Sequence, residues 1–434
     1  MSTPTTSFGR EAAAAISRSK NEPSWLVAWR EEAGELAATL ELPKPEKTPI
    51  ARWNLDVQGV HRPGKAVFSP AELPQAIASL LDAQSDAPVI VQHNSSVVFA
   101  RLPEELKAKG VVLSSLEDAA RTHEDLLRAH LMKAYEPNEH KLSAMHAALW
   151  NGGVFLYVPR GVEIEAPVQA ILFADDAEAT FVPHILVVAD ANSRVSVVEN
   201  VTSSLGETEA TLLHNGAVEV FAKAGAHVQY AAVHHMDSSA IDISYRRAVL
   251  DNDARIEWII GDMHEGNVVA DTLSVLKGNG STSDAKVISV GTGSQRMSLT
   301  TRAVHFGRSS ESDMVTRAVM KDEATAIING ISKIEKGATK ANGQQTERVL
   351  MLSPKARGDA NPILLIDEDD VKAGHAASVG QVNAEQVHYL MSRGITRTEA
   401  ERLIIYGFLD PVVSEIPLEA AREQLQRILE RKLG

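Results

Sequence analysis

Cysteine is absent from the 434 residues of this chain. The chain can therefore form no disulfide, which suits a reducing compartment. The thiolate of cysteine is both a nucleophile and a metal ligand, so any function that needs a thiolate must take it from another protein.

Positive charge is also scarce. The chain has 43 Lys and Arg residues against 57 Asp and Glu residues, a formal net charge of −14, and no stretch concentrates the basic ones. Binding to a phosphate backbone needs a concentrated basic surface. We therefore expect no nucleic-acid partner.

Long apolar runs and a secretory signal are missing as well. No uninterrupted apolar stretch approaches the ~20 residues that cross a bilayer. The first ten residues, Met1 to Arg10, lack the basic-then-apolar pattern of a secretory signal. We expect a cytoplasmic protein with no membrane partner.

Several catalytic motifs do not occur in the sequence. There is no G-x-x-x-x-G-K-[ST] phosphate loop, no G-x-S-x-G nucleophile turn and no H-E-x-x-H zinc helix. ATP hydrolysis would therefore belong to a partner. We expect no enzymatic activity and no catalytic residues.

The residues that are present divide the chain into three zones: a helical region over 1–150, a β-rich core over 151–372 and a helical region over 373–434. In the first zone, Trp25, Trp29, Ala33 and Leu36 recur at helical spacing and predict a helix over 25–40. Further helices are expected around 73–83 and 115–135, with a strand over 88–92.

The middle zone consists of short β-prone runs between polar turns, with no long helical pattern between them. Several runs begin alike, with a small-residue turn before Val195, Val228, Ile256, Val287 and Val315, at spacings of 33, 28, 31 and 28 residues. A recurring unit without helices predicts the stacked coils of a β-helix. A β-sandwich or jelly roll is the competing interpretation.

The third zone is helical again. Asn383 with Gln386, and Thr396 with Glu399, are capping-box pairs that mark helix starts. A last amphipathic segment follows Pro417. These short helices are typical of a docking module or of a cap on the β-helix.

Read together, these segments resemble the SufB/SufD family of iron–sulfur cluster assembly proteins, over roughly residues 22–417. The motifs that carry the resemblance are Glu22-Pro-Ser-Trp-Leu with Arg30, Gly153-Val-Phe-Leu-Tyr-Val-Pro-Arg-Gly-Val162, Gly374-His-Ala-Ala-Ser-Val-Gly-Gln-Val382, Tyr389-Leu-Met-Ser-Arg-Gly-Ile395 and Ala400-Glu-Arg-Leu-Ile-Ile-Tyr-Gly-Phe408.

The resemblance implies a mainly β protein, with a right-handed parallel β-helix between helical terminal regions. It implies a heterodimer with a SufB-like paralogue through the β-helix, a SufC-like ABC ATPase on the C-terminal helices, and a homodimer as a possible state of the chain alone. It also implies no stably bound cofactor, but an iron ion or iron–sulfur cluster shared transiently with the SufB-like partner.

The absence of cysteine favours the SufD-like type, because iron–sulfur clusters are held chiefly by thiolates. His375 is the predicted metal ligand. The resemblance places it in the loop after the β-helix, where SufD-like chains have a histidine facing the SufB partner, and a neutral imidazole can bind iron. Ala373 stands where many relatives carry cysteine. Alternatively, His375 only supports the interface, and the subunit is purely architectural.

Other polar and apolar groups are weaker candidates. The acidic run 367–370 could hold iron or be a solvated turn, and His214, His234, His235, His264 and His305 are each more typical of hydrogen-bonded core or surface positions than of ligands.

A β-helix enzyme acting on polysaccharide is a remote alternative, disfavoured by an aromatic content of 5%. The predicted contact residues for the ATPase, or else the core of the helical module, are Leu403, Ile404, Tyr406 and Phe408.

Overall fold

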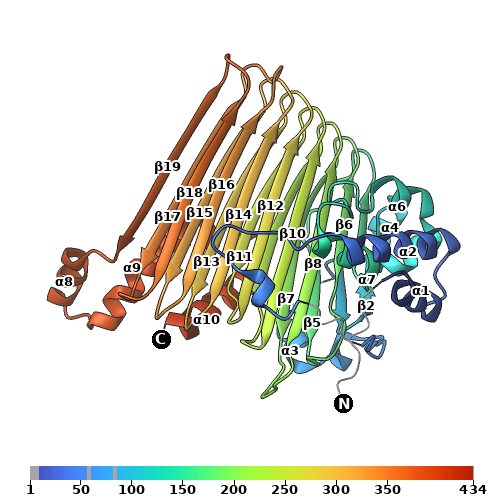
Figure 1. Cartoon of the computed structure of the whole chain (residues 1–434), viewed down its shortest axis with the longest axis horizontal. Coiled ribbons are helices and arrows are strands. Elements are labelled where there is room, and N and C mark those ends of the chain that lie inside the picture. The colour runs from blue at the N-terminus through green and yellow to red at the C-terminus, as the bar shows by residue number, and fades with distance from the viewer. Residues whose placement is uncertain (1–8, 56–59, 82–85, 434) are drawn as a thin grey trace.

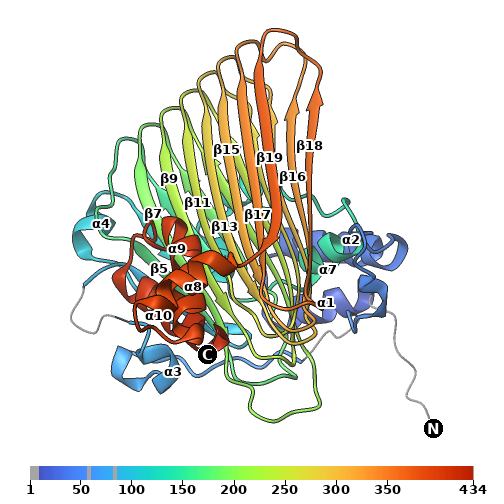
Figure 2. The ribbon, with the colours of Figure 1, turned by 90° about the vertical axis from the view of Figure 1, so that its left-hand side faces the viewer.

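The protein is a stack of β-coils (Figure 1) with helical layers on two opposite faces (Figure 2). This architecture comes from a computed structural model, which describes residues 9–55, 60–81 and 86–433. The helices and 3-10 turns are α1 (Arg10–Ser19), α2 (Ser24–Thr39), η1 (Ile50–Arg52), η2 (Pro70–Glu72), α3 (Gln75–Ala78), α4 (Glu104–Ala108), α5 (Leu116–Thr122), α6 (Glu124–His130), α7 (Lys141–Leu149), α8 (Ala384–Ser392), α9 (Arg397–Val413) and α10 (Glu419–Leu433).

The strands are β1 (Val89–His93), β2 (Ser96–Arg101), β3 (Val112–Ser114), β4 (Val154–Val158), β5 (Val168–Ala174), β6 (His184–Ala189), β7 (Arg194–Ser203), β8 (Leu212–Ala222), β9 (His227–His235), β10 (Ala240–Leu250), β11 (Arg255–Asp262), β12 (Asn267–Leu276), β13 (Thr282–Gly291), β14 (Arg296–His305), β15 (Glu311–Met320), β16 (Thr325–Ile334), β17 (Asn342–Met351), β18 (Arg357–Ile366) and β19 (Lys372–Gln381).

Successive strands from β4 onward alternate between two sheets, so each coil adds one strand to each sheet. In the described residues, the order is β19-β17-β15-β13-β11-β9-β7-β5-β1-β2 in one sheet and β18-β16-β14-β12-β10-β8-β6-β4-β3 in the other. Every pairing from β4 to β19 is parallel. The predicted parallel β-helix is confirmed, and the antiparallel sandwich or jelly roll is excluded.

The predicted coil register is correct for two steps and then slips. Val195 pairs with Val228, and Val228 with Ile256, as the spacing predicts. Ile256 then pairs with Ser283, so Val287 stacks four positions further along the strand, on Ile260. The cause is the turn at Gly278–Ser281, which starts β13 earlier than the small residues before Val287 suggest.

The backbone conformation marks the start of each coil better than the small residues do. A residue with positive φ stands two positions before the start of β7, β9, β11, β13, β15 and β17. Glycine, asparagine and aspartate tolerate this left-handed conformation best, so small polar turns recur there. The residues are Asn192, Gly225, Asp253, Gly280, Ser309 and Lys340.

The space between the two sheets, which we call the lumen, is filled mainly by apolar side chains. Val228, Tyr230, Ile256 and Trp258 are all fully buried there. Strands of a parallel sheet covered on both faces are apolar almost throughout, which is why the runs in the middle zone show little alternation.

The N-terminal region covers the outer face of the nine-stranded sheet with α1, α2 and α5–α7 (Figure 2). The predicted helix over 25–40 corresponds to α2, and the predicted strand over 88–92 to β1, which extends the ten-stranded sheet by pairing with β5. Around 73–83 only Gln75–Ala78 is helical, and positions 82 and 83 lie outside the described residues.

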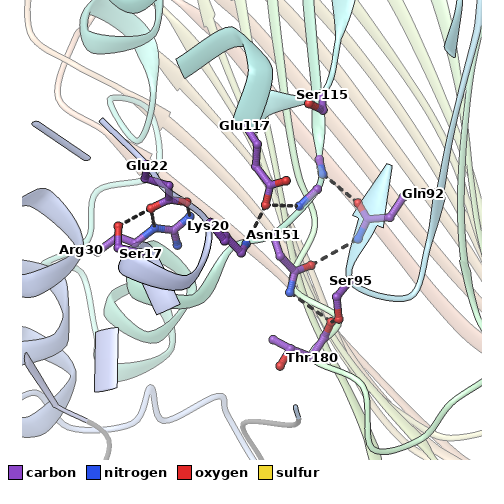
Figure 3. Close-up of polar contacts among 12 residues, drawn as sticks. Ser17, Lys20, Glu22, Arg30, Gln92, Ser95, Ser115, Glu117, Asn151 and Thr180 are labelled. Atoms are coloured by element: carbon purple, nitrogen blue, oxygen red, sulfur yellow. Dashed lines mark hydrogen bonds and ion pairs between the residues drawn. The ribbon is translucent and has the colours of Figure 1, made fainter. Parts of the chain in front are cut away.

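A buried ion pair anchors this layer (Figure 3). Arg30 donates from Nε and from the second guanidinium nitrogen to Glu22, both at 2.7 Å, and to the carbonyl of Ala148 at 3.1 Å. Its guanidinium also lies 4.1 Å from the ring centre of Trp150. Glu22 receives a further hydrogen bond from Ser17. Helices α1, α2 and α7 are thereby joined through one charged centre.

The C-terminal helices begin where the last strand ends. Strand β19 runs to Gln381, so the boundary expected at 372/373 falls at the start of a strand rather than of the helices. Thr396 and Glu399 form the reciprocal capping box that the sequence predicts. The prediction for Asn383 and Gln386 is confirmed in one half: Asn383 accepts hydrogen bonds from Glu385 N and Gln386 N, as an N-cap does. Within the described residues, no helix has both the length and the apolar character to cross a bilayer.

Candidate functional site: the open end of the β-helix and the C-terminal helices

The last coil of the β-helix is uncovered. Strands β18 and β19 end their sheets, and most of their side chains are exposed, whereas the preceding coils are largely buried. Terminal coils of solenoid proteins need a cap, and an unpaired strand edge invites pairing with another chain. We call this surface the open end; its exposed large apolar residues are Ile363, Leu365, Ile366 and Val379.

His375 lies at this open end, but not in a loop as expected. It is the fourth residue of β19 and pairs in parallel register with Gln345 of β17. Paired residues in a parallel sheet point to the same face. Because Gln345 is buried and bonds to Ser332 of the opposite sheet, His375 belongs to the row that faces the mouth of the lumen.

Two polar side chains lie one coil below this mouth. Gln345 and Glu347 are 1% and 2% exposed, and Glu347 Oε2 has no hydrogen-bond partner. The side chain of Glu347 occupies the space above Gly330, where a Cβ atom would come within 1.9 Å of its Oε1. Burial raises the pKa of Glu347 to about 7. The open end therefore combines an exposed imidazole with a carboxyl group, in the coil beneath it, whose pKa lies near 7.

The C-terminal helices pack on the outer face of the ten-stranded sheet. Helix α9 lies against β11, β13 and β15, and α10 against β9, on the face opposite the N-terminal helices (Figure 2). Their buried side, including Ile405, Leu409 and Leu425, forms one core with Ile259 and Ile288 of the sheet. The module is therefore fixed to the middle coils.

The four predicted contact residues of α9 are only partly available to a partner. Leu403 is 50% exposed, and Ile404 is half-buried. Tyr406 and Phe408 are half-buried against the sheet core, and Arg317 of β15 stacks on the Phe408 ring with 5.5 Å between guanidinium and ring centre.

The prediction missed two exposed residues of α8. Tyr389 and Met391 are 57% and 43% exposed. With Leu403, they are the large apolar residues that the α8–α9 pair leaves exposed, and we call these three residues the α8–α9 surface. Their sequence signal was present in the motif that begins at Tyr389, but periodicity alone does not tell which face of a short helix is covered.

The acidic run forms an exposed turn between β18 and β19. Glu368 accepts hydrogen bonds from the backbone N–H groups of Gly337 and Asp369, and it lies 3.7 Å from Lys336. Its carboxylate thus closes a turn, as the solvated-turn interpretation expects.

The histidine candidates separate into distinct environments. His234 faces the lumen with Val228 and Tyr230, as strand alternation predicts, and lies near His214 and His264. His235 points outward and contacts Arg431 of α10. His305 is buried elsewhere in the lumen, 2.9 Å from both Ser310 Oγ and Ser312 Oγ.

The fold places this chain among parallel β-helix proteins with helices on two faces. Comparison with known families shows to which family of these proteins it belongs. Residues 172–408 match the model for the SUF system FeS cluster assembly SufBD core domain, and residues 84–170 match the SufBD protein N-terminal region. The chain belongs to the SufB/SufD family. No observation supports the polysaccharide-acting alternative.

Individual relatives are similar along almost the whole chain. The chain is 44% identical to the iron–sulfur cluster assembly protein SufD of Bacillus subtilis, over 98% of each chain. It is 27% identical to SufB of the same organism, over 95% of this chain and 90% of SufB. A SufBD family protein of Staphylococcus epidermidis is 26% identical, over 94% of this chain and 89% of that protein. The chain is thus a SufD homologue of the SUF iron–sulfur assembly system.

Proposed function

We propose that this chain is a non-catalytic subunit of a cytoplasmic iron–sulfur assembly complex, and that its open end pairs with a SufB-like paralogue. The observation that carries the proposal is the uncovered last coil, which has a free strand edge and apolar side chains exposed around His375. A second β-helix would cover both features at once.

His375 lends its imidazole to iron or to a nascent cluster held mainly by thiolates of the SufB-like partner. The chain supplies no thiol, so by itself it holds no cluster. A neutral imidazole at the mouth of the lumen is a competent iron ligand, and pairing would bring the partner's ligands to the same place. The same surface could support a homodimer when the partner is absent.

The α8–α9 surface binds a SufC-like ABC ATPase. Exposed Tyr389, Met391 and Leu403 supply the aromatic, thioether and aliphatic groups that are typical of interface cores. The chain contains no phosphate-binding loop, so the ATP-driven step belongs to that partner.

Replacing His375 by Ala tests the imidazole against the purely architectural role. We expect His375→Ala to leave co-purification with both partners unchanged and to lower the yield of reconstituted cluster on the complex several-fold, because one ligand is lost. Cluster formation is measured anaerobically from the visible absorption of the purified complex. His388→Ala serves as the matched control, because His388 is also an exposed histidine but lies on α8 rather than on β19. Wild-type cluster yield in both variants would leave only the architectural role.

Replacing Leu403 by Asp tests ATPase docking. We expect affinity for the SufC-like subunit to fall ~10-fold to 100-fold, because a charge replaces an apolar contact at the interface. The melting temperature should change little, since Leu403 is half exposed. Isothermal titration with the purified ATPase subunit measures the affinity.

The control for Leu403→Asp is Phe68→Asp, which introduces the same charge at a residue that is 94% exposed and lies outside the α8–α9 surface. Equal weakening by both variants, or by neither, would contradict docking at the α8–α9 surface.

A further inference from the structure

Seven ionisable side chains meet inside the lumen, where the neighbouring core is apolar. None of them is more than 3% exposed. They come from β7–β11 and from the turn after β11, and they belong to both sheets. We call them the lumen cluster: Glu199, His214, His234, Asp242, Arg246, Asp262 and His264.

Four members present one donor atom each to a common point. The donor atoms of His234, Asp242, Asp262 and His264 all lie within 4.8 Å of one another. The distance from His264 Nε2 to Asp242 Oδ2 is 2.9 Å, and that from His234 Nδ1 to the same oxygen is 3.7 Å. In a tetrahedral site with bonds of about 2.0–2.1 Å, neighbouring donors are about 3.4 Å apart, so only small movements are needed.

The local structure orients these donors. Asp242 Oδ1 is engaged by His214 Nδ1 and accepts a hydrogen bond from Ser244 Oγ at 2.8 Å, which leaves Oδ2 facing the cluster. His234 and Asp262 are register partners on adjacent strands β9 and β11, so their side chains stack side by side. Secondary contacts of this kind fix metal-binding side chains in known sites.

The polar atoms at the centre of the cluster lack hydrogen bonds. Neither carboxylate oxygen of Asp262 has a hydrogen-bond partner, and Oδ1 makes only an ion-pair contact of 3.5 Å with Arg246. Asp242 Oδ2 and His264 Nε2 lie 2.9 Å from each other, but in a geometry that completes no hydrogen bond. Buried polar groups in native proteins are almost always satisfied. Four such atoms around one point indicate a bound group that supplies their interactions.

The charges of the cluster point to a cation. The side chains of Glu199, Asp242 and Asp262 contribute three carboxylates, and Arg246 contributes one guanidinium. The charge of Glu199 raises the pKa of His234 to about 9 despite its burial, so this imidazole offsets a second carboxylate. The three carboxylates still outnumber these two cations in a buried site, where uncompensated charge is strongly unfavourable. We propose that the four converging side chains bind one divalent first-row transition-metal ion, such as Fe²⁺ or Zn²⁺. Two imidazoles and two carboxylates are typical ligands for such ions.

Metal binding requires one local change. His264 Nδ1 accepts a hydrogen bond from Met236 N at 3.2 Å, so the proton of the neutral ring is on Nε2. Ligation through Nε2 moves that proton to Nδ1, and the bond from Met236 must be given up. The turns after β9 and β11 therefore differ between the metal-free and metal-bound protein.

A surface cavity lies on the outer side of the turn that carries His264. The cavity has a volume of about 510 Å³, and Glu265, Gln295 and Lys432 are among its lining residues. Gln295 and Lys432 both donate to the carbonyl oxygen of His264, so the turn that carries this ligand separates the cavity from the lumen cluster. Lys432 belongs to α10, whose end thus closes over the turn.

The test is a titration of the full-length, chelator-treated chain with Co²⁺ under anaerobic conditions, followed by displacement with Zn²⁺ or Fe²⁺. We expect one equivalent to bind with the visible d–d absorption of a nitrogen- and oxygen-ligated site. Asp262→Asn keeps the shape of the side chain and removes a ligand charge. We expect this variant to bind on the order of 100-fold more weakly.

Two variants serve as matched controls. His305→Gln alters another buried histidine of the lumen, and His375→Ala removes the exposed metal ligand of the proposed function. Both variants should still bind one Co²⁺ ion per chain with the affinity of the wild type. If His375→Ala still binds the metal ion, the lumen site does not depend on the proposed role of His375 in cluster assembly. No stoichiometric binding by the wild type, or binding that Asp262→Asn leaves unchanged, would overturn the proposal.

A second test uses only the wild-type chain, so its result does not depend on whether a variant folds. Crystals of the wild-type chain are grown with Zn²⁺, and anomalous diffraction locates the metal ion. The expected result is a zinc peak between β9, β10 and β11 with nitrogen and oxygen ligands. A peak only at other residues, or none, would overturn the site.

Discussion

Replacing Arg30 by Ala should lower the free energy of unfolding of the chain by about 3–5 kcal/mol. The side chains of Arg30 and Glu22 are 0% and 2% exposed, so the substitution leaves a buried carboxylate without its partner. It also removes the hydrogen bond to the Ala148 carbonyl and the stacking on Trp150. Urea unfolding followed by tryptophan fluorescence measures the loss. Four of the five tryptophans, Trp25, Trp29, Trp53 and Trp150, belong to this layer.

Arg10→Ala is the matched control. Arg10 bonds to Glu31 and Glu35 in the same helical layer, but its side chain is 61% exposed, so water replaces the lost contacts. We expect almost no change in the urea midpoint. If the urea midpoint of Arg30→Ala is as close to that of the wild type as the midpoint of Arg10→Ala, the buried pair does not anchor the layer.

The effect of Arg30→Ala should depend on pH. Burial alone would raise the pKa of Glu22, but the charge and hydrogen bonds of Arg30 outweigh burial and lower it. A lowered pKa in the folded state gives stability that is present above the unfolded value, about 4.3 for Glu, and that is lost as the pH falls through the folded value. The gap between wild type and Arg30→Ala should therefore be full at pH 7 and narrow below pH ~4.

Replacing Val379 by Lys should weaken pairing with the SufB-like partner on the order of 100-fold. Val379 is 45% exposed on the last strand, in the row that faces the mouth of the lumen. A lysine there must lose its water when a second β-helix closes the open end, and charged residues on edge strands oppose pairing. Dissociation constants measured by biolayer interferometry with the purified partner test the effect.

Phe306→Lys is the matched control for Val379→Lys. Phe306 is 48% exposed and lies in the turn after β14, away from β18 and β19. It should leave the dissociation constant unchanged. If Val379→Lys pairs as tightly as Phe306→Lys, the partner does not bind at the open end.

The fold class was predictable from the sequence because turn chemistry and β-prone runs are local signals. The register was less predictable. Ser283-Asp-Ala-Lys286 looks like a turn before a strand, but it already belongs to β13, since the chain reverses at Gly280. Only the pairing with β11 shows where the strand begins. The tertiary context overrode the local pattern.

His375 shows the same limit at the candidate site. The family resemblance predicts a loop after the β-helix for the segment that follows Gly374, yet this segment forms β19 because β17 supplies a complete row of backbone partners. The lumen cluster was out of reach for a different reason. Its members lie far apart in the chain and on opposite sheets, and a single sequence does not tell which coils stack.

The attachment of α9 to β11, β13 and β15 has a geometric consequence for the whole assembly. Only β17 lies between β15, the last strand that α9 contacts, and β19 at the open end. The separation between α9 and the open end is therefore set by the number of coils, at about 4.8 Å per coil. Gaining or losing one coil between residues 321 and 371 would shift α9 relative to His375 by one such step. A change in the length of a turn in this stretch would leave that separation unchanged.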